Sequence, residues 1–242
     1  MAQQDVDRNE ELWKDEARIQ RWAAEAQARE AARAQQLKLM AALLPFEDDE
    51  AFTFVDFGAG TGMAARAIMD VYPNAHAVLA DFSPAMMGEG AKAMAPYEGR
   101  YRYVTFDMRA GEWPADMPSP IESAVSSQCI HHIPDERKQG LFREIFERLK
   151  PGGWYVNFDP VKASDPNVGH VWERVNDRFD PKAAYKRTHR SPQEHDQYEN
   201  HVRYMIDLER QLGFFREAGY EAVDVYWKQL DYVIYGGRKP RH

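Results

Sequence analysis

The stretch VDFGAGTGMAARA, residues 55–67, brings three glycines and one acid together, and it decides the fold class. The apolar residues 51–57 are typical of a β-strand, and residues 61–72 have a helical pattern that ends before Pro73. Glycines at a strand-to-helix turn let a ligand approach the backbone closely. Asp56 lies beside Gly58 and Gly60 and would repel a phosphate. The ligand must therefore suit both a glycine loop and an anion.

Short β-rich runs alternate with helical patterns on either side of this stretch. Such alternation predicts crossover units and a parallel sheet. We expect an α/β fold with a Rossmann-like, seven-stranded, mostly parallel sheet, helices on both faces and a helical N-terminal cap. The last two strands are too close for a crossover, so they predict a C-terminal antiparallel hairpin. The expected strands are residues 51–57, 75–82, 100–107, 121–128, 152–159, 221–227 and 231–239.

One domain is expected over residues 1–242, in four parts. Residues 1–50 form the N-terminal helical cap, since residues 9–44 have apolar positions near helical spacing. Residues 51–159 form the cofactor-binding core. Residues 160–203 show little periodicity and are expected as a substrate-cap insertion. Residues 204–242 supply the final helix and the strands that complete the sheet.

The composition favours a cytoplasmic protein that acts on small molecules. The formal net charge is −8, which opposes general nucleic-acid binding. Cys129 is the single cysteine, so neither an internal disulfide nor a cysteine-rich metal cluster is expected. No apolar run approaches the ~20 residues of a membrane span, and no secretory signal is expected at the N-terminus. His189, His195 and His201 are six apart, which is not a usual ligand spacing, and no metal is predicted.

Three acids lie at successive strand ends, and this joint placement is the functional signal. In an open parallel sheet the ligand binds beyond the carboxyl ends of the strands. Asp81 can accept hydrogen bonds from ribose hydroxyls, and Asp107 can receive an adenine amino group. Residues 60–65 also fit the dinucleotide pattern G-x-G-x-x-A, but a pyrophosphate would lie near Asp56. S-adenosylmethionine carries no phosphate, and its cationic end suits Asp56.

Five segments in order carry a resemblance to a known family: VDFGAGTG, LADFSPAMM, FDMRAGEWP, SSQCIHHIPD and LKPGGWYVNFD. Residues 52–159 resemble the class I S-adenosylmethionine-dependent methyltransferases, in the small-molecule branch with an HH pair after strand four. The resemblance implies S-adenosyl-L-methionine as cofactor and nine binding residues: Asp56, Gly58 and Gly60 at the methionine end, Asp81 at the ribose, Phe82 and Met86 near the adenine, Asp107 and the backbone N–H of Met108 at the adenine edge, and Gln128 near the sulfonium.

His131 and His132 are the candidate catalytic bases, because they follow strand four beside the expected methyl position and histidine titrates near neutral pH. A structural reading, in which His132 packs against the following helix, stays open. Asp159, Trp172 and Tyr198 are candidate substrate-binding residues. The expected partner is a small-molecule acceptor rather than a membrane or nucleic acid.

Other readings remain open at this point. The sequence is also similar, more distantly, to uridine-modifying tRNA methyltransferases and carboxy-S-adenosylmethionine synthases. A non-catalytic cofactor-binding protein is a further alternative, because several chemistries share this fold. The N-terminal helices could form a lid or mediate a homodimer. The basic residues between Lys182 and Arg190 could hold an acidic substrate or RNA.

Overall fold

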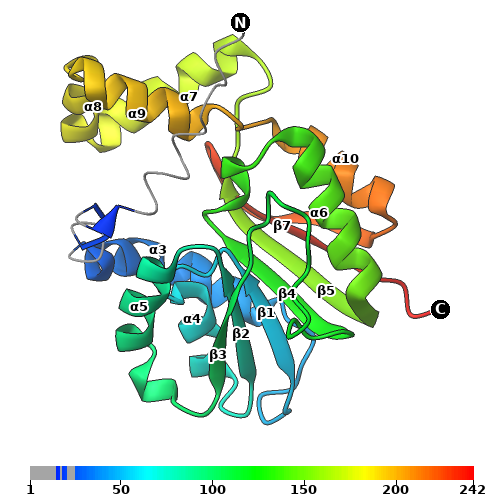
Figure 1. The fold of residues 1–242 in the computed structure, drawn as a ribbon. Coiled ribbons are helices and arrows are strands. Elements are labelled where there is room, and N and C mark those ends of the chain that lie inside the picture. Colours follow the sequence, from blue (N-terminus) through cyan, green and yellow to red (C-terminus); the bar gives the residue numbers. More distant parts are fainter. Residues whose placement is uncertain (1–14, 17, 21–24) are drawn as a thin grey trace, which may run out of the picture.

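A seven-stranded sheet forms the centre of the structure, a computed structural model that describes residues 15–16, 18–20 and 25–242 (Figure 1). The strand order is β3-β2-β1-β4-β5-β7-β6. The strands are β1 (Thr53–Phe57), β2 (His76–Asp81), β3 (Tyr101–Thr105), β4 (Ile121–Ser127), β5 (Leu149–Pro160), β6 (Glu221–Gln229) and β7 (Tyr232–Arg238). This order and content confirm the predicted fold class.

The pairing of the strands sets where their ends meet. β1 pairs in parallel with both β2 and β4, β2 pairs with β3, and β4 pairs with β5. The carboxyl ends of β1 to β5 therefore lie along one edge of the sheet. β7 pairs antiparallel with both β5 and β6, which confirms the predicted closing hairpin.

Helices cover both faces of the sheet. α3 (Ala26–Ala42), α4 (Met63–Val71) and α5 (Pro84–Ala93) lie on one side, and α6 (Asp135–Arg148) and α10 (Leu208–Ala218) on the other (Figure 1). Successive strand residues point to opposite faces, so Phe54 packs with the α3 and α4 cluster whereas Val55 packs with the α6 and α10 cluster. No helix in the described ranges combines the length and apolar character needed to cross a bilayer.

Local sequence signals explain several element boundaries. Ser83 caps α5 by accepting a hydrogen bond from the Met86 backbone N–H at 3.3 Å, and Pro84 occupies the first turn. Both were expected from the sequence. α10 ends at Gly219, which has a φ of 102° and so adopts the left-handed conformation that glycine tolerates.

The N-terminal cap is helical where the structure describes it. α3 packs on α4, and the Tyr72 hydroxyl donates to the carbonyl oxygens of Ala41 and Leu44 at 3.1 and 3.3 Å. The Arg66 guanidinium on α4 contacts the Glu30 carboxylate on α3. The expected helix between residues 9 and 25 lies largely outside the described residues.

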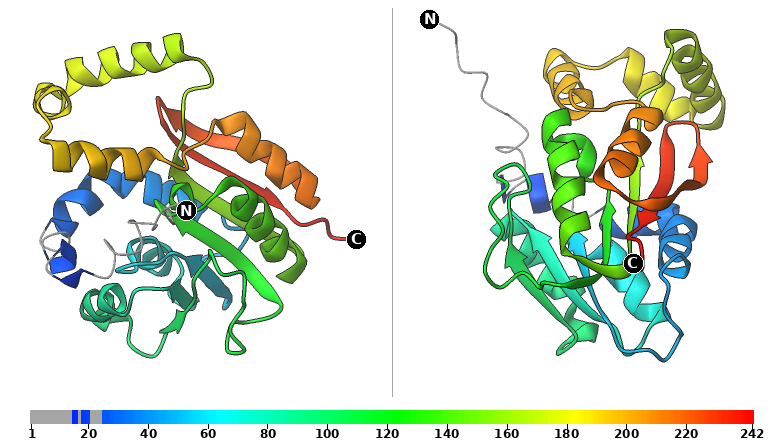
Figure 2. Two further views of the ribbon diagram at one scale, coloured as in Figure 1. Left: turned by 45° about the horizontal axis from the view of Figure 1, so that its top comes forward. Right: turned by 90° about the vertical axis from the view of Figure 1, so that its right-hand side faces the viewer.

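Residues 160–203, for which the sequence predicted a substrate cap but no helices, are largely helical. This segment folds into α7 (Pro166–Phe179), α8 (Pro181–Thr188) and α9 (Pro192–Val202). Each helix begins with a proline that follows an aspartate or a serine, and Asp165 and Ser191 accept capping hydrogen bonds from backbone N–H groups. Apolar periodicity is weak because these helices bury little: Val171 is 44% exposed and Phe179 is 83% exposed. Figure 2 shows the three helices standing beyond one end of the sheet.

Candidate functional site

The glycine loop after β1 adopts a conformation that side chains resist. Gly58, Gly60 and Gly62 have φ values of 67°, 53° and 77°, in the left-handed region that favours glycine. A Cβ on Gly58 would lie 2.6 Å from the Cys129 Cβ, and one on Gly60 would lie 2.9 Å from the Met86 Cε. The loop can therefore bring its backbone against a ligand only because these positions carry no side chain.

Asp56 lies under this loop as an orphaned acid. Its side chain is 1% exposed, and among the described residues neither carboxylate oxygen has a partner within full hydrogen-bond geometry. Burial raises the pKa of Asp56 to about 8 and the charge of Asp81 adds to this, whereas the Ala65 backbone N–H acts in the opposite direction. A buried carboxylate without partners is costly, so this position favours a ligand that brings a positive charge or hydrogen-bond donors.

Asp81 closes β2 and organises the loop. Its two carboxylate oxygens accept hydrogen bonds from the Gly60 backbone N–H at 2.7 Å and from the Ser83 backbone N–H at 2.9 Å. Burial raises the pKa of Asp81, and these hydrogen bonds act in the opposite direction. Each carboxylate oxygen has a second lone pair, so the acid can also accept hydrogen bonds from ligand hydroxyls.

Asp107 follows β3 and carries a partner that the sequence reading did not include. Its carboxylate accepts from the Arg109 side chain through Nε and a terminal nitrogen, both at 2.9 Å. The same guanidinium lies 4.8 Å from the centre of the Phe82 ring. An adenine amino group at Asp107 would therefore share the carboxylate with Arg109.

One cleft brings the predicted cofactor residues together. It contains about 980 Å³ of empty space, the open mouth included. Arg33 of α3, Arg109 and His132 also line it. No local sequence pattern marks Arg33, because only the packing of α3 brings it to the cleft. All nine predicted positions line this cleft: Asp56, Gly58, Gly60, Asp81, Phe82, Met86, Asp107, Met108 and Gln128.

The two candidate catalytic histidines lie in the short turn η2 (Ile130–His132) after β4. His131 is 2% exposed and its Nδ1 is 2.8 Å from the Asp159 Oδ1, while its backbone N–H donates to the Asp159 Oδ2 at 2.7 Å. Burial lowers the pKa of His131 and of His132 well below the usual value, and raises the pKa of Asp159. Both imidazoles are therefore neutral at physiological pH.

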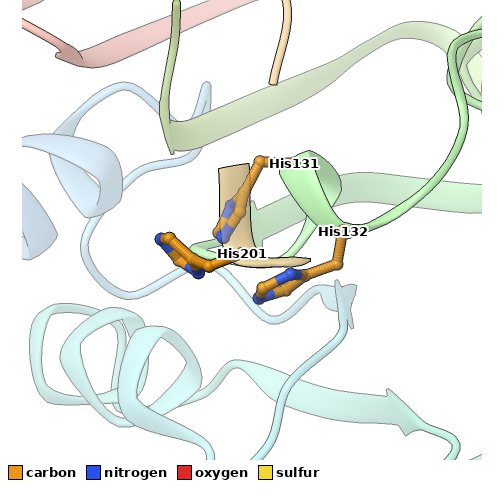
Figure 3. A group of neighbouring side chains, drawn as sticks. All are labelled: His131, His132 and His201. Atoms are coloured by element: carbon orange, nitrogen blue, oxygen red, sulfur yellow. The ribbon is translucent and has the colours of Figure 1, made fainter. Parts of the chain in front are cut away.

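His201 joins this pair from a distant part of the chain. It lies on α9, and its ring centre is 4.7 Å from that of His131 and 5.3 Å from that of His132 (Figure 3). The sequence reading compared His201 only with the two other histidines of its own segment. The contact of α9 with η2, which no short-range spacing encodes, creates the cluster.

The other predicted substrate residues lie apart from the cofactor cleft. Asp159 is fully buried behind His131. Trp172 of α7 faces the Lys228 ammonium, 4.4 Å from its ring centre, and Tyr198 of α9 faces the Arg190 guanidinium at 3.6 Å. Neither aromatic ring lines the cleft described above. Their substrate-binding roles stay predictions.

Comparison with known proteins finds similarity to methyltransferases. Residues 54–153 match a methyltransferase domain family. The chain is 28% identical over 127 residues to Methyltransferase tpcM of Aspergillus fumigatus, covering 51% of this chain and 37% of that one. It is 28% identical over 144 residues to the malonyl-[acyl-carrier protein] O-methyltransferase of Halorhodospira halophila, covering 59% and 44%. The chain thus spans less than half the length of these curated relatives.

A solved structure extends the likeness to nearly the whole fold. Human N-acetylserotonin methyltransferase in complex with SAM superposes with a TM-score of 0.65 at 15% identity, covering 95% of this chain and 58% of that one. Residues 54–153 are thus similar to a methyltransferase domain family, and the fold is that of a solved S-adenosylmethionine-binding methyltransferase.

Proposed function

We propose that this protein transfers a methyl group from S-adenosylmethionine to a small-molecule acceptor. The observation that carries the proposal is the orphaned, buried Asp56 carboxylate beneath a glycine loop. The ammonium of the cofactor supplies the positive charge that this acid lacks, and the backbone N–H groups of the loop suit the cofactor carboxylate. When bound, the cofactor supplies an activated methyl group on its sulfonium.

The remaining cleft residues fit the rest of the cofactor. Asp81 is proposed to accept hydrogen bonds from the ribose hydroxyls, and Phe82 and Met86 to pack on the adenine. Asp107 and the Met108 backbone N–H are proposed at the adenine edge, and Gln128 near the sulfonium. The lining of one cleft by all these positions supports the assignment.

His131 and His132 are the residues proposed to act on the acceptor. Methyl transfer from a sulfonium is an in-line displacement, so the protein mainly aligns the acceptor and excludes water. The acceptor also loses a proton, and a neutral imidazole can receive one. Asp159 holds the His131 ring in place through Nδ1, and His132 lines the cofactor cleft.

A small molecule is preferred to RNA as the acceptor. Two relatives carry names of small-molecule or carrier-bound methyl acceptors, malonyl-[acyl-carrier protein] and trans-aconitate. The basic segment around α8 is partly neutralised, since the Arg187 guanidinium lies 2.6 Å from the Asp177 carboxylate. Poorly supplied positive charge weakens phosphate binding. We keep a cytoplasmic location, and a homodimer through the N-terminal helices, as predictions from the sequence alone.

Labelled-methyl transfer tests the proposed function. The tag-free chain is incubated with methyl-labelled S-adenosylmethionine and with either the small-molecule fraction or the tRNA fraction of a cell extract. Label in the small-molecule fraction supports the proposal, and label in tRNA alone contradicts the acceptor class. Binding of S-adenosylhomocysteine without transfer to either fraction favours a non-catalytic binding protein. No binding of S-adenosylhomocysteine contradicts the proposal as a whole.

A further inference from the structure

Three imidazoles lie close together, two from η2 and one from α9 (Figure 3), and that of His132 also lines the cofactor cleft. One ring nitrogen from each of His131, His132 and His201 lies within 4.8 Å of the other two. The ring centres of His131 and His132 are 3.9 Å apart. A cluster of three imidazoles on elements far apart in the chain needs an explanation beyond packing.

The hydrogen bonding of His131 aims one nitrogen into this cluster. With Nδ1 donating to the Asp159 Oδ1 at 2.8 Å, the lone pair is on Nε2. That Nε2 atom is buried and, among the residues that the structure describes, has no hydrogen-bond partner. A carboxylate behind a histidine whose other nitrogen is open is the usual arrangement around a metal-ligating imidazole.

We propose that His131, His132 and His201 bind one divalent transition-metal ion, of the type of Zn²⁺. Neutral imidazole is a preferred ligand of zinc, copper, iron and nickel. Three protein ligands leave one tetrahedral position open, as in metal sites that take a water or a substrate oxygen. Asp159 is a positioning residue in this proposal, because it orients His131 and does not reach the ion.

Binding of a metal ion requires the three ligand nitrogens to move closer together than they are in this structure. Zinc–nitrogen bonds of about 2.0–2.1 Å in a tetrahedron place the ligand nitrogens about 3.4 Å apart, against the present limit of 4.8 Å. His201 is the most exposed of the three side chains, so its ring has room to move. α9 is anchored near its start by a capping box, in which Ser191 and Glu194 exchange hydrogen bonds.

Charged groups near the histidine cluster include some that oppose a bound cation and some that offset this opposition. Lys138 and Arg33 act on His131 and oppose a bound cation. The Lys138 ammonium is itself offset by the Asp135 carboxylate at 3.2 Å. The fully buried Asp159 carboxyl group contacts the cluster through His131. A carboxyl group that orients a histidine ligand from behind is also found in other three-histidine sites.

The metal site stands without the proposed function, but its use in catalysis rests on that function. The site adjoins the cofactor cleft through His132, which belongs to both. An acceptor oxygen in the open position would become more acidic, because a metal ion lowers the pKa of a bound hydroxyl. The substrate class would then be a small molecule with a hydroxyl or carboxyl group, and His131 would be a ligand rather than a free base.

Calorimetry with Zn²⁺ alone tests the site. The tag-free chain is stripped with a chelator and titrated with Zn²⁺, and we expect one ion per chain. His201→Ala should weaken Zn²⁺ binding at least tenfold, and since His201 is exposed this change should leave the fold intact. His195→Ala is the matched control, because His195 lies exposed on the same helix; it should bind as the wild type does.

A second probe reports the ligands themselves. Co²⁺ in place of Zn²⁺ gives visible absorption bands that depend on the ligand set, and His201→Ala should change them. Asp159→Asn should weaken Zn²⁺ binding 10- to 100-fold, the usual effect of losing an outer partner of a metal ligand. Binding of S-adenosylhomocysteine is measured on each variant, so the cofactor site and the metal site are judged separately. Absence of saturable Zn²⁺ binding, or equal binding by wild type and His201→Ala, overturns the proposal.

Discussion

The cofactor cleft and the histidine cluster lie side by side but are built in different ways. The cleft is lined mainly by residues between Asp56 and Ile133, and backbone hydrogen bonds fix its loop, such as that from the Gly58 N–H to the Ala80 carbonyl at 2.8 Å. The histidine cluster joins η2 to α9, and α9 buries no residue fully. The comparison teaches that the cofactor cleft depends on local backbone geometry, whereas the histidine cluster depends on docking of a lightly packed helix.

The largest loss of stability is expected when one methyl group is added to the glycine loop of the cofactor cleft. Gly58→Ala forces a side chain into a left-handed position and against the Cys129 Cβ, 2.6 Å away. The free energy of unfolding should fall by about 2–5 kcal/mol, the sum of the backbone and overpacking costs. Urea denaturation followed by circular dichroism measures it.

Gly99→Ala is the control for this variant. Gly99 also has a left-handed φ, 80°, but a Cβ there would meet nothing within 4 Å. It should lose only the backbone cost of about 1–2 kcal/mol. Equal losses in the two variants would contradict the view that close packing against Cys129 constrains the loop.

The next effect concerns a buried asparagine of β5 in the central sheet. Asn157 is fully buried; its Oδ1 accepts from the Ser126 hydroxyl at 2.6 Å and its Nδ2 donates to the Tyr235 hydroxyl at 2.7 Å. Asn157→Leu removes both hydrogen bonds and should lower the free energy of unfolding by about 2–3 kcal/mol. Asn74→Leu, at an exposed asparagine, should cost under about 1 kcal/mol. An unchanged free energy of unfolding in Asn157→Leu would show that this polar network contributes no stability.

A separate, pH-dependent effect arises from the acid buried in the cofactor cleft. The pKa of Asp56 is about 8 in the folded protein, above its ordinary value of 3.8, so the folded state binds more protons between these pH values. Its contribution to the free energy of unfolding therefore falls as pH rises from about 4 to about 8, by up to about 1.4 kcal/mol per pH unit. Thermal and urea unfolding across this range should show a shallower slope for Asp56→Asn. An identical slope in wild type and Asp56→Asn would exclude this titration.

The smallest effect concerns α9, the helix that brings His201 to the histidine cluster. Ser191→Ala removes the side chain that accepts from the Glu194 N–H at 3.2 Å at the start of α9. It should destabilise the helix by about 1 kcal/mol. Amide hydrogen exchange should then be faster in α9 and unchanged in β1 and β4. Faster exchange across the whole sheet would mean that α9 is part of the core rather than a docked element.

The difference between the cofactor cleft and the histidine cluster also explains which features could be predicted from the sequence. The strands, the Ser83 cap and the lining of the cleft follow from local signals, since alternation and strand-end acids are read over a few residues. The helices of residues 160–203 were missed because they bury little and so lack apolar periodicity, although the Asp165–Pro166 and Ser191–Pro192 pairs signal helix starts. The approach of His201 to the η2 pair depends on tertiary docking, which no local spacing records.

Arg109 shows an intermediate case. It lies two positions after Asp107 in the sequence, so its ion pair could have been expected, and the pair now occupies the predicted adenine edge. Arg33 had no local signal at all, because α3 packs on α4 and reaches the cleft only in the folded chain. Short-range partners of a motif residue are therefore worth examining before a role is assigned to that residue.

Calorimetric titration with S-adenosylhomocysteine tests the central claim, that the glycine cleft binds this cofactor. Wild-type chain should bind saturably, and Asp81→Ala should bind about 10- to 150-fold more weakly, since hydrogen bonds to a charged acceptor contribute about 1.5–3 kcal/mol. Asp116→Ala, at an exposed acid paired with Arg102 at 3.7 Å, should bind as wild type does. Absence of binding by the wild type, or equal affinity of wild type and Asp81→Ala, would contradict the account.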